Sequence, residues 1–114
     1  MSEAGQDPLR VALKMVKAVN QRDVVRYRAT LSDTFRGESD GWLVASTGDE
    51  DGIRAVRSWA AHPDAHVVVE DAEVVGGFVL LRYRVVDGDR SAKACSVLEL
   101  RGSQIVRAWR YGVA

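Results

Sequence analysis

The feature that most constrains the fold is a run of four strand-like segments in the second half of the chain. They span residues 65–75, 78–86, 90–100 and 104–112, and the short sequences GG, DGD and RGS separate them. Segments rich in valine and leucine that are bounded by such glycine turns are typical of β-hairpins. We therefore expect a four-stranded antiparallel meander.

The first half of the chain predicts three helices. Asp7 followed by Pro8 is typical of a helix start, and Asp23 can cap a second helix. A third helix is expected from about Asp51 to Ala61, and the segment between the second and third helices is interpreted as a loop or short strand. The expected apolar faces are formed by Leu9, Ala12, Leu13, Val16 and Val19, by Val24, Tyr27 and Leu31, and by Ile53, Val56, Trp59 and Ala60. Helices followed by a meander indicate a single α+β domain over residues 1–114.

Charge and cysteine content exclude several classes of protein. The 16 basic and 16 acidic residues cancel, so the basic excess of a nucleic-acid-binding protein is missing. No apolar run approaches the roughly 20 residues of a membrane-spanning helix, and the polar N-terminus lacks a secretory signal. Cys95 is the only cysteine, which leaves no internal disulfide or thiolate zinc site. We expect a cytoplasmic protein without metal or cofactor, in which Cys95 acts as a small hydrophobe.

The register of the hairpins predicts which side chains face inward. Two-residue turns at Gly76-Gly77 and at Asp87-Gly88 place Glu70 opposite Tyr83 on the inner face. The full expected inner face comprises Val68, Glu70, Ala72, Val74, Val79, Leu81, Tyr83, Val85, Ala94, Ser96, Leu98 and Leu100.

The opposite, outer face of the predicted sheet is also partly apolar. In the same register Phe78 opposes Val97, and Leu80 opposes Cys95. A sheet with two apolar faces usually has both of them covered, and the helices can cover only one. We therefore expect a homodimer through the outer face, with Phe78, Leu80, Cys95, Val97, Trp109 and Tyr111 at the interface.

Three stretches together resemble the nuclear transport factor 2-like superfamily, which includes the SnoaL-like polyketide cyclases and the ketosteroid isomerases. They are GDEDGIRAVRSW, HPDAHVVVEDAEVVGGFVLLRYRV and the closing GSQIVRAWRYG, and the resemblance runs from about Leu9 to Tyr111. It implies three N-terminal helices packed on a curved antiparallel sheet. That sheet forms a cone-shaped half-barrel with an internal cavity, and members commonly dimerise through the outer sheet.

The ketosteroid isomerase chemistry does not carry over to this chain. The resemblance places Met15 at the tyrosine that donates to the oxyanion, and Ser96 at the protonated carboxylic acid. The general-base aspartate falls near Ser39, between Glu38 and Asp40. Methionine and serine cannot supply the acidic donors that stabilise an enolate.

The last strand contains an arginine, Arg110, between two aromatic residues. A two-residue turn at Gly102-Ser103 would place Ile105, Trp109 and Tyr111 inside the sheet. A three-residue RGS turn would instead pair Leu98 with Val106 and Ser96 with Ala108, and turn Arg110 inward. The resemblance favours the second arrangement. A buried arginine needs a carboxylate, and the candidates are Glu70, Glu38 or a group on a ligand.

These patterns lead to three candidate functions. The favoured one is a pocket domain that binds a small apolar ligand, with Tyr27, Trp42, Trp59, Ser96, Ala108 and Arg110 as ligand contacts. The alternative is a cofactor-independent enzyme of secondary metabolism (a cyclase, isomerase, dehydratase or epoxide hydrolase) with Glu70, Tyr83 and Arg110 as catalytic residues. The third is a purely structural dimerisation module. The acidic run 49–51 is interpreted as complementing the dipole of the third helix.

Overall fold

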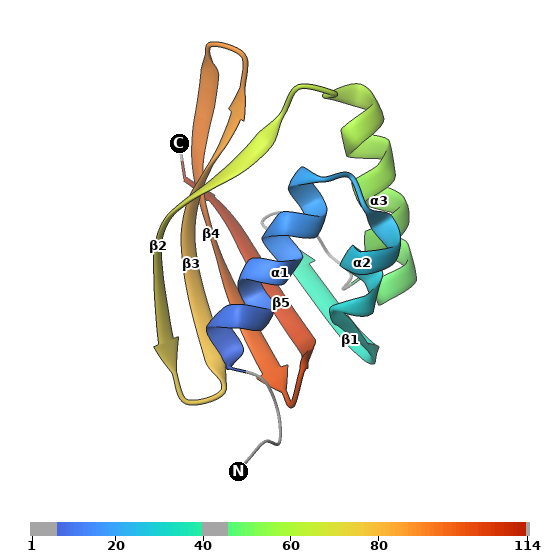
Figure 1. Ribbon diagram of the computed structural model, residues 1–114, viewed down its shortest axis with the longest axis vertical. Helices are drawn as coiled ribbons and strands as arrows, with labels where there is room; N and C mark the ends of the chain where they lie inside the picture. The colour runs from blue at the N-terminus through green and yellow to red at the C-terminus, as the bar shows by residue number, and fades with distance from the viewer. Residues whose placement is uncertain (1–6, 40–45, 114) are drawn as a thin grey trace.

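The computed structural model describes residues 7–39 and 46–113. Two helices, α1 (Pro8–Asn20) and α2 (Val24–Ala29), precede the strand β1 (Leu31–Ser39) and the helix α3 (Gly48–Ala61). Four strands then follow: β2 (His66–Val75), β3 (Phe78–Asp87), β4 (Arg90–Arg101) and β5 (Gln104–Val113). Figure 1 shows the three helices on one side of the curved sheet. No helix of the described residues is long and apolar enough to cross a membrane.

The sheet is mixed, with the strand order β1-β5-β4-β3-β2. The meander from β2 to β5 is antiparallel as predicted, but β1 runs parallel to β5, so the expectation of a wholly antiparallel sheet is wrong. Leu31, expected to extend the second helix, begins β1 and is buried with Phe35. The polar sequence of β1 hides this strand, because few of its residues are β-branched or aromatic.

Three glycines set the hairpin turns. Gly76, Gly88 and Gly102 each open a two-residue turn with a positive φ near 60°, the conformation that a hairpin turn with glycine first requires. The second turn is therefore Gly88-Asp89, and the predicted Asp87-Gly88 turn was wrong by one residue. The error slides β4 by two positions along β3, which keeps the side chains of these two strands on their predicted faces.

A β-bulge at Glu70 reverses the alternation in the first part of β2. Asp71 pairs with Arg82, but the next pair toward the start of the strand is Val69 with Tyr83. Glu70 therefore does not oppose Tyr83, and the predicted pairing was wrong. Val69 packs against the core, whereas Val68, predicted to face inward, is 42% exposed. One extra residue in a strand shifts the frame of everything before it.

A second bulge, at Val106, decides the orientation of β5. The turn is the two-residue Gly102-Ser103, and Leu100 pairs with Ile105, but Glu99 then pairs with Arg107. Ile105 and Ala108 are consequently both buried, and Arg110 follows Ala108 on the same face. Arg110 turns inward as favoured, although through a bulge rather than a three-residue turn. The predicted pairings were wrong, since Leu98 opposes Ala108 and Ser96 opposes Arg110.

The core lies between the helices and the inner face of the sheet. Its buried apolar members are Val11, Ala12, Ala18, Tyr27, Leu31, Phe35, Val79, Leu81, Leu98, Leu100, Ile105 and Ala108. The predicted apolar face of α3 is wrong in part, because Ile53 and Val56 are 56% and 46% exposed, whereas Trp59 is half-buried and packs against Tyr27. α3 instead buries Asp51 and Gly52. A carboxylate on the buried side of a helix calls for a partner, which the site supplies.

Candidate functional site

Arg110 stands at the centre of the candidate site. Its side chain points to the inner face of β5 and is 26% exposed. Its guanidinium group binds the Asp51 carboxylate with two nitrogens: Nη1 donates to Oδ1 at 3.1 Å, and Nη2 donates to Oδ2. This fork-to-fork arrangement is the strongest geometry for an arginine–carboxylate pair. The expected partners Glu70 and Glu38 were therefore wrong.

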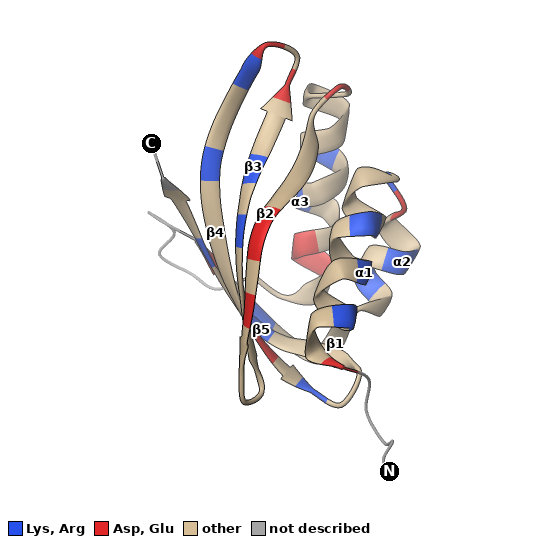
Figure 2. Ribbon diagram, turned by 60° about the vertical axis from the view of Figure 1, so that its left-hand side comes forward, with Lys and Arg blue, Asp and Glu red and all other residues tan. Residues whose placement is uncertain are grey.

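The start of α3 places Asp51 where Arg110 can reach it. Thr47 caps the helix, and its hydroxyl accepts from the backbone N–H of Glu50, whose carboxylate accepts from the N–H of Thr47. This capping box fixes the first turn. Asp51 follows directly and is 3% exposed, whereas Asp49 and Glu50 are exposed. Figure 2 shows the acidic residues in this first turn. The dipole interpretation suits the two exposed acids but misses the role of Asp51.

Two hydroxyl groups complete the shell around the Asp51 carboxylate. Tyr27 Oη donates to Oδ2 at 2.7 Å, and Ser46 Oγ donates to Oδ1 at 2.8 Å. Burial alone would raise the pKa of Asp51. The hydrogen bonds and the positive charge of Arg110, together with the hydrogen bonds from Tyr27 and Ser46, outweigh burial and lower this pKa below its ordinary value. Asp51 is therefore an ionised anchor, not a proton acceptor.

Tyr27 is fixed in its neutral form. Its side chain is 6% exposed, and burial, with a further contribution from the neighbouring Asp51 carboxylate, raises the pKa of the phenol far above its ordinary value. The ring packs edge-on against Trp59, with centroids 6.4 Å apart and planes at 75°, the T-shaped geometry that aromatic pairs favour. Tyr27 thus contacts both the polar cluster, through its hydroxyl, and Trp59, through its ring.

The cluster lies at the edge of a pocket between α1, α3 and the inner face of the sheet. The pocket has a volume of about 310 Å³, near the lower end of the usual range for small-molecule sites. Its walls are mostly apolar, and its polar side chains are few. The lining residues are Met15, Val16, Val19, Tyr27, Ala55, Ser58, Trp59, Val67, Leu81, Tyr83, Val85, Ser96, Leu98 and Arg110.

A second polar pair lines the pocket on the sheet side. The hydroxyl groups of Tyr83 on β3 and Ser96 on β4 are hydrogen-bonded at 2.9 Å. Ser96 is buried and Tyr83 is half-buried. Either hydroxyl can donate to the other, so the pair offers both a donor and an acceptor to the pocket.

The structure gathers most of the predicted site residues but not all of them. Tyr27, Trp59, Tyr83, Ser96 and Arg110 line the pocket, together with Met15 from the isomerase comparison. Ala108 is buried in the core and does not line it. Trp42 and Asp40 lie outside the described residues.

Glu70 lies away from the pocket. Its carboxylate pairs with Arg84 Nε at 2.9 Å, and both side chains are more than a third exposed. The bulge is the physical reason, because it removes Glu70 from the alternation that would have aimed it inward. Over residues 7–39 and 46–113, no group of three His, Cys, Asp or Glu side chains is placed to hold a metal ion.

Asp51 and Ser46 are members of the polar cluster that the sequence interpretation missed, and Asp51 is the central one. Its helical spacing was a usable signal: Asp51, Ala55 and Trp59 recur every four residues and therefore share one face of α3. Ala55 and Trp59 both line the pocket. Asp51 shares a helix face with two apolar pocket residues, and the inward Arg110 needs a carboxylate. Together these two signals indicate the Asp51–Arg110 pair.

Comparison with known proteins identifies the architecture. No protein-family model and no curated protein matches the sequence. Solved structures do match. A cystatin-fold protein from Novosphingobium aromaticivorans is 23% identical, with a TM-score of 0.84 over 93% of this chain and 98% of its own. IdmH from Streptomyces antibioticus, described as a candidate polyketide cyclase, is 15% identical, with a TM-score of 0.84 over 94% and 92%.

An NTF2-like protein of unknown function from Cytophaga hutchinsonii is 15% identical, with a TM-score of 0.75 over 98% of this chain and 95% of its own. Further structural neighbours are described as SnoaL-like and as having a ketosteroid isomerase-like fold. Identities at this level carry the fold alone. The chain has the α+β fold of the NTF2-like, SnoaL-like and ketosteroid isomerase-like proteins.

Proposed function

We propose that this chain is a SnoaL-like pocket domain that binds a small, largely apolar and uncharged molecule between α1, α3 and the inner face of the sheet. The apolar walls favour an apolar body. The Tyr83 and Ser96 hydroxyl groups suit one polar group on the ligand. The Arg110 charge is already balanced by Asp51, so a charged ligand gains no counterion there.

One observation carries this proposal: the charged groups at the pocket are engaged with one another. The Asp51 carboxylate accepts from Arg110, Tyr27 and Ser46, and its pKa is lowered. A general base needs a pKa near the working pH and an oxygen free to take a proton. Of the Asp and Glu residues in the described part of the chain, none lines the pocket, and the Asp51 carboxylate is bound by Arg110.

The catalytic alternative is less well supported. It needs Glu70, Tyr83 and Arg110 to act on one substrate. Tyr83 and Arg110 line the pocket, but Glu70 is engaged with Arg84 outside it. Without an acid in the lining, the two remaining residues can orient a carbonyl or hydroxyl group, but no carboxylate is present there to act as a general base.

Binding can be tested with 2-naphthol, a neutral aromatic probe that carries one hydroxyl group. We expect saturable binding by calorimetry, with amide shifts in NMR spectra confined to residues around the pocket. Ala55 lines the pocket, whereas Ala60 on the same helix is exposed. Ala55→Trp should abolish binding by filling the volume, and Ala60→Trp should leave it unchanged. Equal affinities for the two variants would contradict the proposal.

We also propose that the outer sheet face forms a homodimer interface. Leu80, Val97 and Trp109 stand opposite one another across β3, β4 and β5. Cys95 pairs with Tyr111 in the next row, and Phe78 and Tyr111 are each 42% exposed. A row of apolar side chains across three strands is the kind of surface that a second subunit covers.

The dimer can be tested by light scattering at micromolar concentration. Wild-type protein should have twice the 12.5 kDa mass of the chain. Leu80→Glu should give the monomer mass, since it places a charge in the middle of the apolar row. Val56→Glu, on the helical side and 46% exposed, is the control and should remain a dimer. A wild-type monomer would refute the interface.

A further inference from the structure

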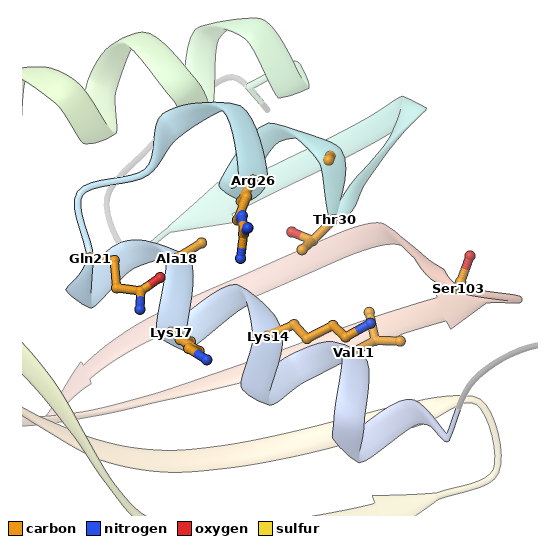
Figure 3. A pocket seen from close by; sticks show the side chains of 9 residues that line it. Val11, Lys14, Lys17, Ala18, Gln21, Arg26, Thr30 and Ser103 are labelled. Atoms are coloured by element: carbon orange, nitrogen blue, oxygen red, sulfur yellow. The ribbon is translucent and has the colours of Figure 1, made fainter.

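A second hollow lies between α1 and α2, on the other side of α1 from the pocket described above. It has a volume of about 430 Å³, and it shares no lining residue with that pocket. Figure 3 shows Arg26 reaching from α2 toward α1, Lys14 extending along the hollow toward Val11, and Ser103 at its far end. We call this the α1–α2 groove.

The groove exists because short side chains face each other across it. Val11, Lys14, Ala18 and Gln21 recur at helical spacing and form one stripe of α1. Ala18 and Val11 are almost fully buried and make an apolar floor, and Ala29 faces them from α2. Two alanines at a helix–helix contact leave space that larger apolar residues would fill.

The rim of the groove is positively charged. Lys14, Lys17 and Arg26 line it, and no Asp or Glu is among the lining residues. Arg26 also pairs with Asp23 at 3.4 Å, which offsets part of this charge. The whole chain has a net charge of zero, so the gathering of cations here is local. Figure 2 shows the basic residues along α1 and α2.

Uncharged hydrogen-bond donors accompany the cations. Gln21 lines the groove near Lys17, and Ser103 from the β4–β5 turn lines its other end. Among residues 7–39 and 46–113, neither side chain has a hydrogen-bond partner, and Lys17 has no ion-pair partner there. Ammonium, amide and hydroxyl donors around one hollow are the groups that bind phosphate oxygens.

We propose that the α1–α2 groove binds a small soluble organic phosphate monoester. The phosphate would lie at the cationic rim, where its charge of about −1.5 to −2 meets more than one cation. The organic part would lie on the apolar floor of Val11 and Ala18. The recessed shape favours a compact molecule over a flat macromolecular surface. This site is independent of the proposed apolar pocket, and its test can fail without affecting that proposal.

Phenyl phosphate is a suitable probe, and about pH 8 keeps it dianionic. We expect saturable calorimetric binding that weakens as salt is added, with amide shifts confined to α1, α2 and the β4–β5 turn. Benzyl alcohol, which lacks the phosphate, and inorganic phosphate, which lacks the ring, should both bind less tightly. Shifts located elsewhere, or equal affinity for benzyl alcohol, would overturn the proposal.

Two variants separate a built site from general charge attraction. Lys17→Gln should weaken phenyl phosphate binding about tenfold, a loss typical of one hydrogen bond to a charged group. Lys93→Gln removes the same charge from exposed β4 and should have no effect. Ala29→Trp should block the groove sterically, and because Ala29 is exposed this variant should still fold. Equal affinities for Lys17→Gln and Lys93→Gln would overturn the proposal.

A phospholipid headgroup carries the same chemistry, so vesicles form the second arm of the test. Phosphatidylcholine vesicles with and without phosphatidic acid should show no difference in cosedimentation if the ligand is a soluble molecule. Cosedimentation that needs phosphatidic acid and is lost in Lys17→Gln would assign the groove to a membrane lipid and would overturn a soluble ligand.

Discussion

Replacing Asp51 with asparagine tests whether the buried ion pair organises the site. The substitution keeps the shape of the side chain but removes its charge and turns one acceptor oxygen into a donor NH2 group. Each of the two carboxylate oxygens accepts two hydrogen bonds in the structure. In the asparagine variant, the NH2 group takes the place of one of these oxygens. It then faces an Arg110 N–H group together with the hydroxyl of either Tyr27 or Ser46. Arg110 also loses its counterion.

The expected cost follows from burial. Removing one partner of a fully buried ion pair destabilises a protein by roughly 3–5 kcal/mol. Asp51 is 3% exposed, but the Arg110 side chain is 26% exposed and keeps some contact with water. We therefore expect a loss of about 2–3 kcal/mol in the free energy of unfolding. That is a substantial part of the roughly 5–15 kcal/mol that stabilises a typical domain.

Urea unfolding followed by tryptophan fluorescence measures this loss at neutral pH. Asp49→Asn is the matched control, two residues earlier on the same helix. The Asp49 side chain is 84% exposed and pairs with Arg28 at 3.0 Å, so its loss should cost less than about 1 kcal/mol. If Asp51→Asn costs no more than Asp49→Asn, the buried pair does not stabilise the site and the reasoning is refuted.

Three further predictions concern pH, the β2 edge and a turn. Because the pKa of Asp51 is lower in the folded state, the ionised carboxylate stabilises the fold above its unfolded pKa of about 4, and this stabilisation is lost as the pH falls. Acid should therefore destabilise the wild type more steeply than Asp51→Asn. Urea titrations at successive pH values measure the difference. The Asn20 amide binds the backbone N–H and C=O of Val67 at 2.7 and 2.9 Å, so Asn20→Ala should cost about 1–2 kcal/mol and speed hydrogen exchange at the Val67 amide. Gly88→Ala should cost about 1 kcal/mol in thermal unfolding, since φ is +64° while no atom within 4 Å obstructs a Cβ.

Much of the fold could be predicted from local signals. The helix starts at Asp7 and Asp23 are confirmed, because side-chain capping depends on neighbours in the sequence. The four strands of the meander and the Gly76-Gly77 turn are also confirmed. The favoured three-residue turn before the last strand was wrong, since that turn has two residues. The bulge in β2 was not predictable, because Val67, Val68 and Val69 suit either face equally well.

The candidate site was only half visible in the sequence. The inward Tyr83 and Ser96 hydroxyl groups follow from strand alternation once the turns are placed. The inward Arg110 was favoured by the family resemblance, and in the structure the bulge at Val106 produces it. The pairing of Arg110 with Asp51 depends on how α3 lies against the sheet, and 59 residues separate the two in the chain. Periodicity places a residue on a face, but it does not show which distant face will meet it.

The Asn20 contact has a consequence for solubility. β2 is an edge strand, and its sequence HVVVE is the kind of segment that recruits another strand and starts aggregation. Asn20 occupies the outward-facing backbone groups of Val67, and the bulge at Glu70 interrupts the straight edge beyond them. A strand from another molecule therefore finds the Val67 backbone groups already hydrogen-bonded and the regular edge interrupted. The proposed homodimer, which uses the outer face of the sheet, therefore leaves this edge out of the interface.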